Sequence, residues 1–214
     1  LLSRRQRQMC IRDRAEEFAQ LLQYADHIVF NSPGQLATFG PAAKAAGKSV
    51  GLRVNPECST QEGHAIYDPC APGSRLGTTR AQWDAAVAAH PELPELLDGL
   101  HFHTLCEQDA DALAVTLKAV EATFGDLLPK MKWVNFGGGH HVTRPGYDLA
   151  TLEQCICQVQ AKYGVRVYLE PGEAWALNAG YLITTVLDTL QNGDTSLAIL
   201  DTLSLIHISE PTRP

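Results

Sequence analysis

The feature that most constrains the fold is a repeated alternation of short apolar segments with longer segments of helical periodicity. Short apolar runs indicate buried strands, and apolar residues three or four positions apart indicate helices. Strands that alternate with helices form parallel sheets in which the helices are crossovers, so we expect an α/β fold of about five such units. The predicted strands are 28–30, 50–54, 100–104, 133–136 and 165–169; the predicted helices are 15–24, 35–39, 79–90, 109–124 and 149–163.

A barrel accounts for this alternation better than a dinucleotide-binding fold does. The triple glycine at 137–139 lacks the spacing of a Rossmann fingerprint, and polar groups gather where predicted strands end, as they do in TIM-type barrels. After Gly180 the pattern changes, because Gln191-Asn-Gly-Asp194 between two apolar segments is typical of a hairpin. We interpret residues 15–180 as the C-terminal part of a TIM-type barrel and 181–202 as the start of an antiparallel β domain.

The two ends of the chain have a different origin in this interpretation. Residues 1–14 include the segment RRQRQMCIRDR, and residues 203–214 include LSLIHISEPTR. Both resemble translated sequencing adapters. We therefore exclude them from the prediction of the fold, as is done for segments that come from fusion or cloning. The alternative for 1–14 is a basic arm that binds nucleic acid. We expect the native part, 15–202, to be an internal fragment of a longer protein.

The charge of the chain bears on its partners. Removing the six arginines and two acidic residues of the terminal segments from 17 basic and 24 acidic residues leaves 11 and 22, a net charge near −11. An acidic body disfavours nucleic acid and anionic membranes as partners. No apolar run approaches the about 20 residues of a membrane span. We expect a soluble enzyme with a cationic substrate.

The cysteines indicate a reducing compartment. None of those between 15 and 202 forms a C-x-x-C pair, and their number is odd. This pattern favours neither a disulfide framework nor a zinc site, so we expect a cytoplasmic protein without a metal centre. These cysteines are Cys58, Cys70, Cys106, Cys155 and Cys157.

A candidate site begins in the segment Trp133–His141. An apolar run, 133–136, is followed directly by Gly137, Gly138 and Gly139. Glycines allow a sharp turn with bare N–H groups, and successive N–H groups bind anions such as phosphate. A triple glycine also occurs in plain turns. The phosphate interpretation gains support from the polar ends of two other predicted strands, at 101–103 and 169–172.

Five motifs then occur in the order of one known family. Over nearly all of 15–202 the chain resembles the carboxynorspermidine/carboxyspermidine decarboxylases, a branch of the alanine-racemase-type decarboxylases that use pyridoxal 5′-phosphate (PLP). The resemblance implies a PLP-binding barrel with a β domain, a homodimer, and removal of the α-carboxylate from a cationic carboxy-polyamine. The motifs are Gly51-Leu-Arg-Val-Asn-Pro56, Ser74-Arg-Leu-Gly77, His101-Phe-His-Thr-Leu-Cys-Glu107, Phe136-Gly-Gly-Gly-His-His141 and Leu169-Glu-Pro-Gly-Glu-Ala174.

The resemblance also implies roles in cofactor binding. Glu170 matches the carboxylate that bonds the pyridine nitrogen of PLP; the alternative is an acid that caps a turn. His103 matches the histidine that stacks on the ring; the alternative is a core histidine, and His101 is expected one layer deeper. Glu170 and His103 are the predicted catalytic residues. Residues 137–139 match the phosphate loop, and Arg53 matches an arginine near the cofactor.

Two acidic residues are predicted to bind the substrate. The wider group has Glu-Pro-Gly-Arg, whose arginine contacts the phosphate, whereas this chain has Glu173 at that position. We expect Glu173 to contact a substrate ammonium, or else to order its own loop through backbone N–H groups. Glu107 is expected to meet a substrate amine, and the alternative is a role at a helix N-terminus.

The resemblance places the remaining catalytic groups outside this chain. The family's Schiff-base lysine is on the first barrel strand, and its catalytic cysteine and aspartate are in the C-terminal domain. The lysines between 15 and 202 match no such motif. The rival interpretations are a diaminopimelate or ornithine decarboxylase, which Glu173 disfavours, a phosphate-sugar-binding barrel, and a non-catalytic PLP-binding barrel protein, which would lack the hairpin after Gly180.

Overall fold

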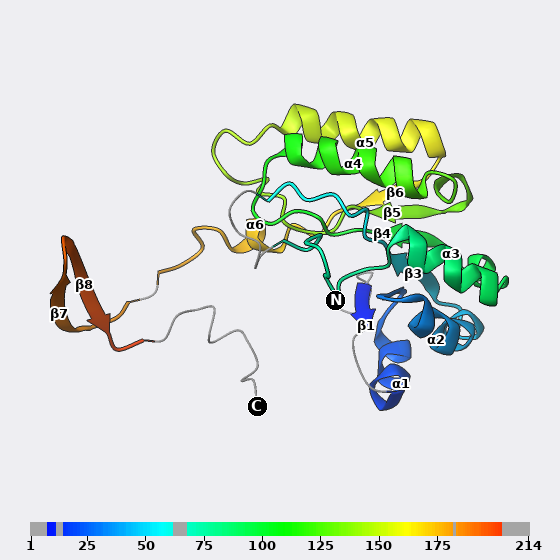
Figure 1. The fold of residues 1–214 in the computed structure, drawn as a ribbon, viewed down its shortest axis with the longest axis horizontal. Coiled ribbons are helices and arrows are strands. Elements are labelled where there is room, and N and C mark those ends of the chain that lie inside the picture. Colours follow the sequence, from blue (N-terminus) through cyan, green and yellow to red (C-terminus); the bar gives the residue numbers. More distant parts are fainter. Residues whose placement is uncertain (1–7, 12–14, 62–67, 182, 203–214) are drawn as a thin grey trace. The chain divides into compact units, whose positions relative to one another are not determined.

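The computed structural model describes residues 8–11, 15–61, 68–181 and 183–202 (Figure 1). The chain divides into two compact units, Leu1–Leu177 and Asn178–Pro214. The first contains a parallel sheet with helices and the second an antiparallel strand pair. The predicted α/β class, and the change to antiparallel strands near residue 180, are confirmed. Within the described residues, no helix has the length and apolar character needed to cross a membrane.

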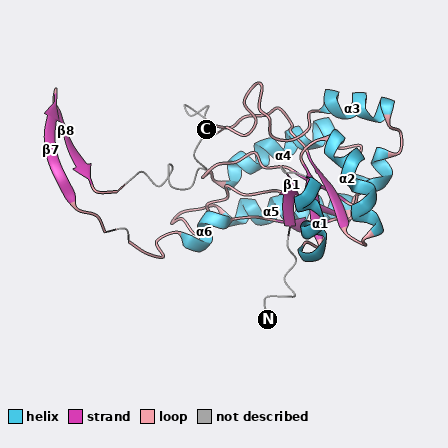
Figure 2. Ribbon diagram, turned by 90° about the horizontal axis from the view of Figure 1, so that it is seen from below, coloured by secondary structure: helices cyan, strands magenta, loops and turns pink. Residues whose placement is uncertain are grey.

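Six parallel strands form the sheet of the first unit, and their order in the sheet is their order in the chain. A parallel pair needs a crossover connection, and helices supply it here. Figures 1 and 2 show α4 and α5 side by side along the sheet. The strands are β1 (Gln8–Ile11), β2 (His27–Phe30), β3 (Ser49–Arg53), β4 (Gly99–His101), β5 (Trp133–Asn135) and β6 (Arg166–Tyr168). The helices are α1 (Ala15–Tyr24), α2 (Pro33–Ala45), α3 (Arg80–Ala89), α4 (Ala110–Phe124), α5 (Leu149–Tyr163) and α6 (Gly172–Ala176), with 3-10 turns η3 (Leu93–Leu96) and η4 (Leu128–Lys130).

Strand β1 lies in a segment that is excluded above from the prediction of the fold. Gln8–Ile11 pair in parallel with β2 in the structure. The physical reason for this pairing is that the edge of β2 presents unpaired backbone N–H and C=O groups, which pair with any extended segment within reach. The pairing does not test the adapter origin of residues 1–14, which stays a prediction.

Local capping explains the helix boundaries. Helix α3 starts at a capping box in which Thr79 and Gln82 exchange side-chain and backbone bonds, and Asp109 and Asp148 cap α4 and α5. These helices agree with the predicted ones within one residue at each end. Helix α2 is longer than predicted, since it continues through Pro41 to Ala45. Its buried face explains the continuation, because tertiary packing outweighs the poor helix propensity of proline.

The Trp133 side chain packs closely against neighbouring strands of the sheet. A Cβ atom added at Gly51 would lie 2.4 Å from the Trp133 ring, and one at Gly99 would lie 2.1 Å from it. The indole Nε1–H donates to Ser49 Oγ at 2.7 Å. The indole therefore lies across β3 and β4, and only glycine leaves room for it.

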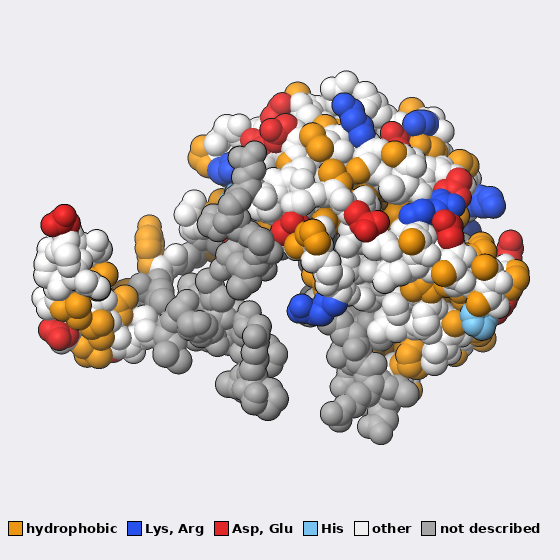
Figure 3. Space-filling view, in the orientation of Figure 1, with side chains coloured by type: hydrophobic (Ala, Val, Ile, Leu, Met, Phe, Trp, Pro, Cys, Tyr) orange, Lys and Arg blue, Asp and Glu red, His pale blue; other side chains and the backbone are white. Residues whose placement is uncertain are grey.

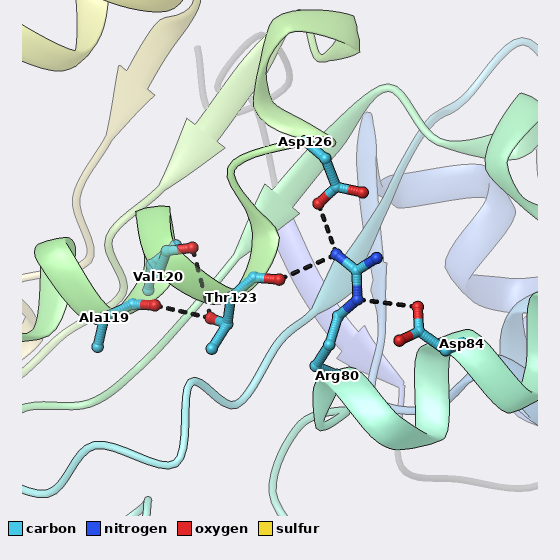
Figure 4. A network of polar contacts seen from close by, with 6 residues as sticks. All are labelled: Arg80, Asp84, Ala119, Val120, Thr123 and Asp126. Carbon is cyan, nitrogen blue, oxygen red and sulfur yellow. Dashed lines mark hydrogen bonds and ion pairs between the residues drawn. The ribbon is translucent and has the colours of Figure 1, made fainter.

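Ion pairs join the helices on the outside of the first unit. Arg80 at the start of α3 donates to Asp84 at 2.8 Å, to the carbonyl of Thr123 at 2.9 Å and to Asp126 at 2.5 Å (Figure 4). These bonds connect α3 to the C-terminal end of α4. On the face shown in Figure 3, basic side chains are interspersed with acidic ones.

The second unit contains a hairpin of β7 (Val186–Asn192) and β8 (Thr195–Leu200). Asn192 pairs with Thr195, so the two turn residues are Gly193 and Asp194, one position later than an Asn-Gly turn. Gly193 has a φ of 58°, which glycine adopts without a steric cost. All residues of both strands are exposed, including Leu190 and Ile199. An isolated hairpin of this kind is at best marginally stable in water.

Candidate active site

Polar residues gather where the parallel strands end. In the strand register Arg53 pairs with His101, His101 with Asn135, and Asn135 with Tyr168. This row crosses four strands at their carboxyl ends, and Glu170 follows two residues after Tyr168. Because parallel α/β folds bind their ligands at the carboxyl ends of the strands, this row is the candidate active site.

Glu170 is held by two neighbours from the row. Its Oε2 lies 3.3 Å from His101 Nε2, and its Oε1 accepts a hydrogen bond from Asn135 Nδ2 at 3.0 Å. Burial alone would raise the pKa of Glu170, but the contact with His101, together with the Asn135 bond, outweighs burial and lowers the pKa. The side chain is 38% exposed, so an ionised carboxylate remains accessible to a further donor.

His103 is a neutral imidazole in this environment. The backbone N–H of Gly138 donates to its Nδ1 at 3.3 Å, which assigns the ring proton to Nε2. Burial, followed by the charge of Arg53, lowers the pKa of His103 to about 4. A neutral, half-buried ring does not supply a proton at neutral pH, and its stacking on a cofactor stays a prediction.

The glycine loop, residues 137–139, packs closely between the segment that follows β4 and the backbone of Glu170. Gly137 and Gly139 have φ angles of 71° and 81°. An added Cβ would lie 2.4 Å from the Phe102 carbonyl oxygen at Gly137, 2.7 Å from that of Glu170 at Gly138, and 2.2 Å from that of Leu105 at Gly139. Every position of the triplet therefore requires glycine, for reasons of packing as well as backbone conformation.

Two N–H groups of this loop have partners within the protein. Gly137 donates to Asn135 Oδ1 at 2.7 Å, and Gly138 donates to His103 as described above. The prediction of bare N–H groups is wrong for these two residues, because side chains of the neighbouring strand ends reach them. A role of the loop in phosphate binding stays a prediction.

The remaining predicted residues of the site lie at its edges. Arg53 is 7% exposed at the end of β3, and its charge contributes to the lowered pKa values of His101 and His103. His101 is buried, whereas His103 is half-buried, and His101 is in direct contact with Glu170. No role was predicted for Asn135 from the sequence. Pairing the predicted strand ends in register would have placed it beside Glu170.

Two lysines lie at the other end of the strands. Lys44 and Lys132 both bind Asp98 at the opposite, amino end of β4.

A second cluster joins the two predicted substrate residues. Glu107 and Glu173 lie together with His141, and one donor atom from each residue is within 4.8 Å of the others. His141 Nε2 is 3.1 Å from Glu173 Oε1. The two glutamates are exposed, whereas His141 is 9% exposed. The structure therefore groups Glu107 with Glu173 and adds His141. In the sequence, the only sign of a role for His141 was its position directly after the glycine loop.

Comparison with known proteins places this site in context. No protein-family model matches the chain. It is 41% identical over 195 residues to the carboxynorspermidine/carboxyspermidine decarboxylase of Campylobacter jejuni, a match that covers 91% of this chain and 48% of the relative. The chain is a homologue of these decarboxylases. It is also 36% identical over 206 residues to the carboxyaminopropylagmatine decarboxylase of Synechocystis, covering 94% of this chain and 51% of that one.

Solved structures give the same result. The structure of carboxynorspermidine decarboxylase from C. jejuni in complex with norspermidine matches with a TM-score of 0.73 and 39% identity, over 92% of this chain and 49% of that chain. Diaminopimelate decarboxylase from Helicobacter pylori matches with a TM-score of 0.70 at 19% identity, over 91% of this chain and 52% of that one, and shows a shared fold. The chain spans about half the length of the curated relatives it matches. The family resemblance derived from the five motifs is confirmed.

Proposed function

We propose that the protein is a PLP-dependent carboxy-lyase that converts carboxynorspermidine or carboxyspermidine to the corresponding polyamine. The chain is 41% and 33% identical in sequence to two decarboxylases named for these compounds, which supports the reaction and the substrate class. The observation that carries the chemistry is the ionised carboxylate of Glu170, oriented by His101 and Asn135 and still open to a third partner.

The residues at the strand ends fit PLP. Glu170 is the proposed partner of the pyridine nitrogen, because a carboxylate with a lowered pKa stabilises a proton on that nitrogen. PLP, when bound, supplies a ring that accepts the electrons released as the carboxylate leaves. His103 is proposed to pack on the ring, since it is neutral and its orientation is fixed by Gly138. Arg53 is proposed to contribute positive charge near the cofactor.

The phosphate is assigned to the loop 137–139. Its glycines bring the backbone close to the ends of β4 and β6, and a loop with left-handed residues at two of three positions suits an anion. Because Gly137 and Gly138 donate within the protein in this structure, phosphate binding requires donors other than these two, or a change of their partners.

The cationic part of the substrate is assigned to Glu107 and Glu173. Both carboxylates are exposed and lie in one cluster. Two carboxylates attract an ammonium group, and Glu173 in place of the arginine of the wider group disfavours a diaminopimelate or ornithine decarboxylase. We further propose a closed barrel, a homodimer and a cytoplasmic location for the complete protein.

The test is an assay of CO₂ release by the product of a gene that extends to the full length of the relatives. We expect PLP absorbance, and turnover of carboxynorspermidine or carboxyspermidine well above that of diaminopimelate and ornithine. Carboxyaminopropylagmatine is included because a relative at 36% identity is named for it. A protein that binds PLP but releases no CO₂ from any of these would be a non-catalytic PLP-binding protein and would contradict the proposal.

A further inference from the structure

We propose that Glu107, His141 and Glu173 form a binding site for a divalent transition-metal ion of the zinc class. One donor atom from each side chain lies within 4.8 Å of the other two, the only such group of three among the described residues. The three residues are far apart in the sequence, so the ligand spacing that identifies zinc sites in sequences is absent. The site uses Glu107 and Glu173, which are assigned above to a substrate ammonium, so a metal ion and the substrate amine would compete for this cluster. The test of metal binding does not require decarboxylase activity.

Backbone contacts assemble this cluster. Gln108 donates its N–H to Gly139 at 2.9 Å and accepts one from His141 at 3.4 Å, which places the Glu107 turn beside His141. Glu107 itself has a φ of 53°, a conformation rare for residues other than glycine. Thr143 Oγ1 donates to the carbonyl of Ala174 at 3.1 Å, which ties the same segment to α6 and to Glu173.

His141 supplies an independent sign of a missing ligand. Its side chain is buried, but neither ring nitrogen makes a hydrogen bond in the structure. Nε2 points at Glu173 Oε1 across 3.1 Å without the angles of a hydrogen bond. Buried polar atoms without partners are rare in folded proteins because they are costly. An ion between the imidazole and the carboxylate would satisfy this nitrogen.

The donor set and its spacing suit such an ion. Imidazole with carboxylates is a common ligand set for zinc, at bond lengths of about 2.0–2.2 Å. A tetrahedron with such bonds has edges of about 3.3 Å, close to the 3.1 Å between His141 Nε2 and Glu173 Oε1. Glu107 is exposed and approaches by a change of rotamer. Two carboxylates and a neutral imidazole carry two negative charges, which a divalent ion balances.

The neighbouring Cys106 is not part of the proposed site. Its Sγ is not among the donor atoms that lie within 4.8 Å of one another in this cluster. Three protein ligands with exposed carboxylates leave a fourth position open to water, so we expect an exchangeable ion rather than a closed structural site.

The test is titration of the 214-residue protein with Zn²⁺ by calorimetry and with Co²⁺ by absorption spectroscopy. We expect one site per chain, without a thiolate charge-transfer band. Glu173→Gln, at an exposed position, and His141→Gln should each weaken Zn²⁺ binding by about 100-fold, the upper end of what loss of a supporting group alone costs. Far-UV circular dichroism confirms that each variant is folded.

Matched controls separate this site from others. His90 and Glu92 form an exposed pair at 3.3 Å, so His90→Ala removes a similar pair without a third ligand. His90→Ala and Cys106→Ser should leave binding unchanged. Absence of Zn²⁺ binding, unchanged affinity in folded Glu173→Gln, or loss of binding in either control would overturn the proposal.

Discussion

At the scale of single residues, the environment of Glu170 determines what its carboxylate can do. Burial disfavours the charged form, and the contacts with His101 and Asn135 reverse that effect. His103, which follows the same strand as His101, is neutral because burial, reinforced by the charge of Arg53, lowers its pKa to about 4. Adjacent groups of the site therefore differ in charge for reasons that lie in their tertiary contacts.

Replacing Glu170 with Gln in the full-length enzyme should lower kcat by about 10²–10³-fold, the effect typical for loss of one preorganised electrostatic group. The amide cannot hold a proton on the pyridine nitrogen, while the glycine loop is unchanged, so PLP should remain bound. Turnover and PLP absorbance measure the two effects separately. Glu121→Gln, a carboxylate that binds Lys162 on the helices, is the control. Wild-type kcat in Glu170→Gln would remove this residue from the mechanism.

Replacing Glu173 with Gln should raise the KM for carboxynorspermidine with little change in PLP binding. One charged contact with a substrate ammonium is worth about 1–3 kcal/mol, or about 5- to 150-fold. The alternative is that Glu173 orders its loop. Loss of PLP from the variant would support that alternative, and an unchanged KM with PLP bound would exclude the ammonium contact.

At the scale of elements, Asp98 joins the amino ends of three strands to the carboxyl end of α2. Its side chain is 6% exposed and binds Lys44 of α2 and Lys132 before β5, each at 2.7 Å. It also accepts the N–H of Val50 in β3 at 2.9 Å. Burial would raise the pKa of Asp98, but the bonds with Lys132, Lys44 and Val50 lower it. This carboxylate therefore fixes β3, β4 and β5 relative to one another at the end opposite the candidate site.

Asp98→Asn should lower the free energy of unfolding at pH 7 by about 2 kcal/mol, the range for hydrogen bonds to a charged group. Because the pKa of Asp98 is depressed in the folded state, its contribution is present above the unfolded pKa of about 3.9 and is lost as pH falls through the folded pKa. The difference between wild type and variant should therefore shrink in acid. Denaturant titrations at several pH values measure it.

Asp126→Asn is the matched comparison for Asp98→Asn. Asp126 also forms an ion pair, in its case with Arg80, but its side chain is 55% exposed. An exposed ion pair contributes less than about 1 kcal/mol. An equal loss of stability in the two variants would mean that burial does not set the strength of the Asp98 contacts.

At the scale of the whole molecule, the sheet and the hairpin differ in how far their apolar side chains are buried. The first unit has a continuous apolar core between its strands and helices. The hairpin of the second unit has exposed apolar side chains on both strands. A group of exposed apolar side chains marks a surface that packs against another protein surface.

We predict that the 214-residue chain by itself releases no CO₂ from carboxynorspermidine. No lysine between 15 and 202 lies in a motif of the family's Schiff-base lysine, and the chain spans about half of its relatives. Open sheet edges should also make the purified chain prone to aggregate. A CO₂-release assay with the full-length enzyme as positive control, together with light scattering, checks both statements. Release of CO₂ at a rate near that of the control would show that the chain contains a complete site.

The sequence by itself determined the class of fold and the positions of most elements. Periodicity and capping residues are local, so 79–90, 109–124 and 149–163 were predicted nearly to the residue. The ordered motifs also sufficed for the family, because they combine unusual residues over the whole of 15–202. The extension of α2 through Pro41 and the pairing of β1 were not predicted, since both depend on contacts with distant parts of the chain.

Only the tertiary structure decided which side chains of the candidate site contact one another. Parallel register brings Asn135 and His101 onto Glu170, although 35 and 69 residues separate them from it in the chain. The same is true of His141, which meets Glu107 and Glu173 only through the pairing of two loops. Side-chain chemistry is written in the sequence, but pKa values, hydrogen-bond partners and the grouping of donors depend on distances that arise when strands align.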